Sequence, residues 1–175
     1  ALTSTPAQLA VAGALWREHP STLMQTHLSE NPKEINWVAE LFPDAPDYFG
    51  VYETFGLSGP GAIFGHAIHL TKRERTAIRE SGSAIAHCPT SNTFIGSGLF
   101  DMEGLRDIDQ PVSVGLATDV AGGTSLSMFA TMRSAYEVAQ LRGYSLHPAK
   151  AWYLATVGSA RAMRLEDRIG NLAPG

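Results

Sequence analysis

The sequence predicts an α/β fold in which parallel strands alternate with helices, and two observations lead to this prediction. Four short apolar runs lack the polar–apolar alternation of a half-exposed strand, which indicates strands covered on both faces; they occupy residues 23–27, 62–66, 84–87 and 112–119. The segments between these runs carry the end signals of helices. Strand–helix units in series favour a parallel sheet, either open or closed into a barrel.

Each helix is predicted from the residues at its ends. Asn31 is a good N-cap and Pro32 suits the first helical position, so a helix is expected from residue 32 to about 41. Thr71 and Glu74 have the spacing of a capping box, and Gly82 is a typical stop for the helix that they open. Composition and spacing predict further helices at about residues 6–18, 125–142 and 148–164.

Two kinds of connection stand out. The stretch from about residue 41 to 60 is longer than a usual connection, so we expect an ordered excursion with helical content; its aromatic residues include Tyr48, Phe49, Tyr52 and Phe55. Glycine-rich stretches near residues 96–98 and 122–123 predict loops.

Composition limits the class of protein. The chain has 175 residues, the size of one ordinary domain, and its 17% of charged residues indicates a large interior. A net charge of −4 gives no reason to expect a nucleic acid or an anionic membrane as partner. Cys88 stands alone, which excludes an intramolecular disulfide. Without a signal peptide or a bilayer-spanning apolar run we expect a cytoplasmic protein, and a first residue other than methionine favours a preceding segment.

Ionisable residues fall at the ends of the predicted strands. Three strands end in His27, His66 and His87, and the fourth ends in Asp119. The carboxyl ends of parallel strands converge on one cavity, so these four side chains are expected to face a common point. Histidine and carboxylate are suitable ligands for a catalytic zinc, which keeps one position open for water. Glu30 follows His27 by three residues, a placement that suits a proton shuttle beside such a water.

Other polar residues have simpler interpretations. His87 stays open between a role in the site and a role in tying the loop that carries Pro89 and Asn92. His69 is expected to pack behind the site or against the following helix. Cys88 follows a buried strand and is interpreted as a small packed side chain rather than a nucleophile.

The chain resembles the amidohydrolase superfamily in four segments. They are, in order, HLSEN at 27–31, GHAIHL at 65–70, IAHCPTSN at 85–92 and GLATDV at 115–120. Within the superfamily, the HLSEN variant and TDVAGGTSLSMF at 118–129 favour the guanine deaminases over the triazine hydrolases and adenosine-type deaminases. The similarity extends to RIGNLAPG at 168–175, where chains of the family leave the barrel.

The resemblance implies a fold and a place within it. Residues 1–175 would be the C-terminal portion of a (β/α)8 TIM barrel, comprising strands five to eight with their helices. Strands one to four and a small β-rich domain would be missing. The family's His-x-His pair of strand one occurs nowhere in this chain, and its substrate-gripping arginine is expected just upstream of Ala1.

The resemblance also implies roles for individual residues. His27 and Asp119 would be metal ligands, Glu30 would protonate the purine ring, and His66 would hydrogen-bond the attacking water. Catalysis would rest on Glu30, His66 and Asp119, and substrate binding on His27, Glu30 and Asp119. The cofactor would be one zinc ion per site, although iron serves some relatives. The partners would be guanine and water, and the homodimers common in the family give a second copy as a possible partner.

The implied activity is the zinc-dependent hydrolysis of guanine to xanthine and ammonia, a step of purine catabolism. Because only two of four protein ligands remain, the isolated chain is expected to be inactive. One alternative is another deaminase or chlorohydrolase of the superfamily acting on an amino-substituted heterocycle. A second is a non-catalytic, truncated half-barrel that folds poorly or pairs with another copy to cover its open sheet edges.

Overall fold

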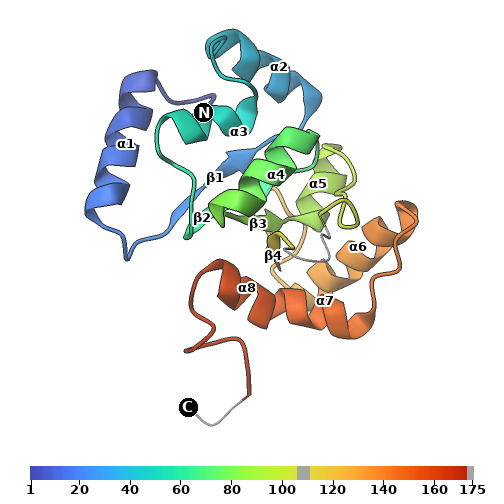
Figure 1. Ribbon diagram of the computed structural model, residues 1–175. Coiled ribbons are helices and arrows are strands. Elements are labelled where there is room, and N and C mark those ends of the chain that lie inside the picture. The colour runs from blue at the N-terminus through green and yellow to red at the C-terminus, as the bar shows by residue number, and fades with distance from the viewer. Residues whose placement is uncertain (106–110, 173–175) are drawn as a thin grey trace.

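A computed structural model describes residues 1–105 and 111–172, and its centre is a four-stranded parallel sheet (Figure 1). The strands follow one another in the sheet in chain order, β1-β2-β3-β4. Their bounds are β1 Met24–Leu28, β2 Ala62–His66, β3 Ala84–His87 and β4 Ser113–Leu116. The prediction of an α/β fold with a parallel sheet is therefore confirmed.

Helices join consecutive strands and flank the sheet. In Figure 1, α1, α2 and α3 gather near β1, whereas α6, α7 and α8 lie toward β4. The bounds of the helices are α1 Pro6–Glu18, α2 Pro32–Leu41, α3 Tyr48–Thr54, α4 Lys72–Ser81, α5 Pro89–Ile95, α6 Met128–Leu141, α7 Pro148–Ala155 and α8 Val157–Ala162. No helix in the described ranges is both long and apolar enough to cross a bilayer.

The predicted helix ends of α2 and α4 are confirmed by their caps. The side chain of Asn31 accepts from the backbone N–H of Glu34, and the side chain of Glu34 accepts from that of Asn31. Thr71 and Glu74 make the same reciprocal pair at the start of α4, and Gly82 ends that helix in the left-handed conformation. Each capping box satisfies N–H groups that a helix start leaves without partners.

The excursion between β1 and β2 supports the end of β1. Phe64 of β2 packs against Phe49 and Tyr52 of α3, with ring centroids 5.2 and 5.3 Å apart. Tyr52 is buried, and its Oη donates a 2.8 Å hydrogen bond to the carbonyl oxygen of His27. The expectation of an ordered, partly helical segment is confirmed, and its aromatic residues fix the backbone at a candidate site residue.

Parallel pairing brings the polar strand ends to one edge of the sheet. His27 pairs with Gly65, and Leu28 pairs with His66. Between β3 and β4, His87 pairs with Leu116. The carboxyl ends of all four strands therefore lie side by side, as the sequence predicts.

Two strand predictions are wrong in detail. β1 alternates between partly buried and exposed residues up to Leu28, so the face that carries Gln25 and His27 is open in the described chain. β4 ends at Leu116, so Asp119 lies three residues beyond the strand, in the loop that follows. The predicted coverage on both faces fits β2 and β3, which are mostly buried.

Two helix predictions also need correction. The segment 148–164 forms two helices rather than one, separated at Thr156. Gly158 of α8 packs closely on β4, since a Cβ there would lie 3.0 Å from the carbonyl oxygen of Tyr153 and 3.1 Å from that of Val114. The predicted helix at 125–142 begins only at Met128, and the loop expected around Pro89 is the short helix α5. In the closing segment 168–175, residues 173–175 lie outside the described residues.

Candidate functional site

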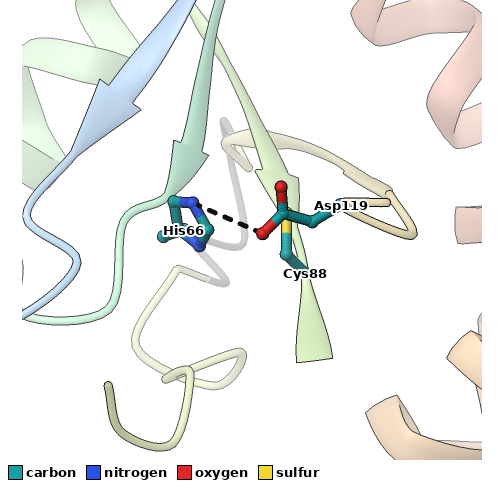
Figure 2. Close-up of side chains that lie close together, drawn as sticks. All are labelled: His66, Cys88 and Asp119. Atoms are coloured by element: carbon teal, nitrogen blue, oxygen red, sulfur yellow. Dashed lines mark ion pairs between the residues drawn. The ribbon is translucent and has the colours of Figure 1, made fainter. Parts of the chain in front are cut away.

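Three ionisable side chains converge at the carboxyl edge of the sheet. Nε2 of His66 lies 3.7 Å from Oε2 of Glu30 and 3.9 Å from Oδ2 of Asp119. The side chain of His66 is 3% exposed, whereas the Glu30 and Asp119 side chains are 17% and 29% exposed. A buried imidazole thus faces two carboxylates that solvent or a small ligand can reach. Figure 2 shows His66, at the end of β2, and Asp119, in the loop after β4, pointing toward each other.

The backbone turns sharply where it delivers these side chains. Ser29, His66, Ala67 and Asp119 all have positive φ, at 45°, 68°, 48° and 49°. Such angles are uncommon outside glycine and cluster at functional sites, where the surrounding structure must hold them. Here the N–H groups of residues 67, 68 and 69 donate to the carbonyl oxygens of Leu28 and Ser29, which ties the two loops together.

Asn92 fixes the protonation pattern of the His66 ring. Nδ1 of His66 lies 2.8 Å from Oδ1 of Asn92, and both side chains are buried. An amide oxygen only accepts hydrogen bonds, so Nδ1 carries a proton. In the neutral ring, Nε2 therefore presents its lone pair toward Glu30 and Asp119.

Glu30 is held at both its backbone and its carboxylate. Its N–H donates a 3.0 Å hydrogen bond to Oε2 of Glu34, and Tyr48 donates a 2.7 Å hydrogen bond to the other oxygen of Glu34. Ser97 donates a 2.8 Å hydrogen bond to Oε1 of Glu30 itself. One carboxylate oxygen is thus occupied, and the other faces His66.

Cys88 is a member of the site that the sequence interpretation missed. In the described part of the chain, one group of potential metal ligands comprises His66, Cys88 and Asp119, whose ligand atoms all lie within 4.8 Å of one another (Figure 2). Burial, reinforced by the negative charge of Asp119, raises the pKa of the Cys88 thiol to about 12. In the sequence, its position directly after the strand-end His87 could have indicated a place in the site. The predicted burial of the preceding strand favoured a packing role instead.

His27 stands beside this group rather than within it. Its ring stacks on that of His66, with centroids 5.1 Å apart and planes 19° apart, and the residue is exposed. Imidazole, carboxylate and thiol groups are donors that zinc accepts. The donors gathered at this edge therefore fit a zinc ion chemically.

His87 lies behind the site, in the core. It is buried and stacks on Phe100 with ring centroids 4.3 Å apart. Burial, with a smaller effect of the nearby His66, lowers the pKa of His87 to about 3, so the ring is neutral near pH 7. Its Nδ1 has no hydrogen-bond partner among the described residues. In the described residues, the observed ring contact of this strand-end histidine is its stacking on Phe100.

Comparison with known proteins places the chain in a family. A family model described as "Amidohydrolase family" matches residues 1–175. The chain belongs to the amidohydrolase family. It is 45% identical over 173 residues to guanine deaminase of Escherichia coli, covering 99% of this chain and 39% of the relative. It is 38% identical to a probable guanine deaminase of Deinococcus radiodurans, covering 99% of this chain and 40% of that relative.

Solved structures of amidohydrolases have the same fold. Guanine deaminase of E. coli superposes with a TM-score of 0.96 over 100% of this chain and 40% of its own. A guanine deaminase of C. acetobutylicum, solved with guanine bound in the active site, is 29% identical with a TM-score of 0.86, over 96% of this chain and 41% of its own. An adenosine deaminase of Xanthomonas campestris with bound zinc is 25% identical with a TM-score of 0.85, over 97% and 38%. The chain spans about two fifths of the length of the relatives it matches.

Proposed function

We propose that this chain supplies half of the active site of a guanine deaminase, which hydrolyses guanine to xanthine and ammonia. The observation that carries the proposal is the convergence of Glu30, His66 and Asp119 at the carboxyl edge of the sheet. The 45% identity to the E. coli guanine deaminase supports guanine as the substrate. In this proposal β1 to β4 are strands five to eight of a (β/α)8 barrel, and the rest of the barrel belongs to the full-length protein.

His27 and Asp119 would hold one zinc ion, with the side chains of His66 and Cys88 close by. When bound, zinc acidifies a water molecule and so makes a nucleophile available at neutral pH. The likeness to an amidohydrolase structure that contains zinc supports this metal over iron.

The chain's own residues then move the proton and orient the reactants. The free oxygen of Glu30 takes the proton of the attacking water and passes it to the ring nitrogen beside the reacting carbon. The lone pair on Nε2 of His66 accepts a hydrogen bond from that water and directs it. His27, Glu30 and Asp119 face the purine. Water adds its oxygen to the carbon and the amino group departs as ammonia, which balances guanine and water against xanthine and ammonia.

The direct test is ammonia release by the full-length protein, loaded with zinc, from guanine, adenine and an amino-triazine. Release from guanine alone is expected. Release from another ring only would be consistent with the proposed acid–base roles but would exclude guanine as the substrate. Absence of release from all three rings by a folded, zinc-loaded protein would contradict the proposed function.

The isolated chain is proposed to be inactive, because it contains no His-x-His pair and so offers an incomplete ligand set. Residues 1–175 should release no ammonia from guanine and bind zinc much more weakly than the full-length protein. Turnover by the isolated chain at a rate near that of the full-length protein would contradict this.

A further inference from the structure

We propose that Ser97 is a positioning residue that orients the carboxylate of Glu30, an inference that rests on the proposed function. Its hydroxyl donates a 2.8 Å hydrogen bond to Oε1 of Glu30 across 67 residues of sequence. Ser97 is 5% exposed, so water competes poorly for its hydroxyl group.

The hydrogen bond decides which oxygen does the chemistry. With Oε1 occupied by Ser97, the oxygen left to face Nε2 of His66 is Oε2, at 3.7 Å. A carboxylate that rotates freely would offer its free lone pairs toward the reacting atoms only part of the time. Holding one orientation in advance lowers the entropy cost of reaching the transition state.

Ser97 is itself held rigidly from behind. Its N–H donates to the carbonyl oxygen of Asn92 at 2.8 Å, at the end of α5. Its own carbonyl oxygen lies 2.8 Å from Nε2 of His69, which must donate because a carbonyl only accepts. This hydrogen bond gives His69 a structural role that the strand-end pattern did not predict.

Gly98 allows this close approach. It has φ of +136°, and a Cβ there would lie 3.2 Å from two atoms of the His69 ring. Any side chain at position 98 would therefore strain the backbone and press on the group that holds Ser97. Segment 96–98, predicted only as a glycine-rich loop, thus links His69 to Glu30.

The experiment compares three variants of the full-length protein in steady-state kinetics with guanine. Ser97→Ala removes the donor, Ser97→Thr keeps it, and His69→Leu keeps the hydroxyl but frees the loop behind it. Ser83→Ala is the matched control, because it also deletes a buried hydroxyl group. That hydroxyl lies at the start of β3, away from the site, and accepts a hydrogen bond from the N–H of Gly59.

Ser97→Ala should lower kcat by about tenfold to a hundredfold, the worth of one hydrogen bond to a charged group, with KM nearly unchanged. Ser97→Thr should restore most of kcat, His69→Leu should lower it less than Ser97→Ala, and Ser83→Ala should leave it unchanged. A Ser97→Ala protein with normal kcat, or one in which kcat falls only in step with thermal stability, would overturn the proposal. His69→Leu keeps the test decisive if Ser97→Ala fails to fold, because normal kcat in that variant then counts against the proposal.

Crystal structures separate this inference from the proposed function. In full-length Ser97→Ala, the Glu30 carboxylate should occupy more than one orientation, whereas the parent protein should show one. The orientation of Glu30 can be determined even if the parent protein releases no ammonia from guanine. That result would contradict the proposed function but not the positioning role of Ser97. A single, unchanged Glu30 orientation in Ser97→Ala would remove Ser97 from the positioning role, whatever the substrate.

Discussion

At the scale of single residues, the proposed mechanism depends most directly on Glu30, which carries the proton. Glu30→Gln in the full-length protein keeps the shape of the side chain but removes the base. Turnover of guanine should fall by at least about two decades, the usual lower range for general acid–base catalysis. Glu40→Gln, at an exposed position of α2, is the control and should keep full activity. Near-normal turnover by Glu30→Gln would remove this carboxylate from the mechanism.

The buried hydrogen bond between Asn92 and His66 makes a stability prediction. Asn92→Leu leaves Nδ1 of His66 without an acceptor in a buried place. The free energy of unfolding of the full-length protein should fall by about 1–3 kcal/mol, the cost of an unsatisfied buried polar group. Urea denaturation measures it, with Asn36→Leu on the exposed face of α2 as the control. Equal losses in the two variants would contradict the assignment.

His87 makes a prediction about pH. Its pKa is lowered from 6.5 to about 3 in the folded chain, so between these values the unfolded chain binds a proton that the folded chain does not. Its contribution to stability is complete above pH 6.5 and is lost as the pH falls toward 3. His87→Leu should therefore flatten the decline in stability over this window. Urea denaturation of both full-length proteins between pH 7 and 4 measures the slopes. A chelator is present in every sample, so that pH-dependent metal binding does not contribute to the measured stability. Identical slopes would show that His87 does not contribute.

The gathering of polar side chains at one edge of the sheet was predicted well from the sequence. Glu30, His66 and Asp119 meet as expected, because parallel strands place their carboxyl ends together. Cys88 and Ser97 could not be found this way. Their roles depend on which way a side chain points after a strand or helix ends, and short-range patterns carry no information on that.

At the scale of elements, local end signals predicted α2 and α4, whose capping boxes are made by residues close together in sequence. The division of 148–164 into α7 and α8 has another origin: Thr156 lies between them with φ −125° and ψ −97°, and α8 then packs on β4 through Gly158. That break is set by a contact with a distant strand, which a window of local sequence does not contain. The early end of β4 likewise leaves Asp119 in a loop with positive φ, a conformation imposed by the site.

The contact between α8 and β4 gives a prediction at this scale. Gly158→Ala puts a Cβ within 3.0 and 3.1 Å of two backbone oxygens, which cannot move aside as a flexible side chain would. The full-length protein should lose about 1–3 kcal/mol of stability, as overpacked sites do. Thermal or urea denaturation measures the loss. Gln140→Ala, at an exposed position of α6, serves as control and should change little; a Gly158→Ala protein as stable as this control would contradict the close packing.

At the scale of the whole molecule, the described sheet has two open edges, β1 and β4. Open edges carry backbone donors and acceptors that readily pair with other chains. The isolated chain should therefore self-associate, and light scattering coupled to size exclusion should give a mass well above 18.7 kDa. The full-length protein, in which further strands are proposed to cover both edges, is the control and should give a discrete species. A stable monomer of residues 1–175 would contradict this prediction.

The order of the strands has a consequence for how the chain is made. In the described chain, β2, β3 and β4 each pair with the strand that precedes them in sequence, so none of these pairings has to wait for a later strand. A ribosome releases the chain from its N-terminal end, and each new strand can dock on an edge that is already formed. The reactive groups would arrive in the same order, with Glu30 first, His66 second and Asp119 last. If the strands dock in this order during synthesis, the carboxylate of Asp119 is the last group to join this half of the site.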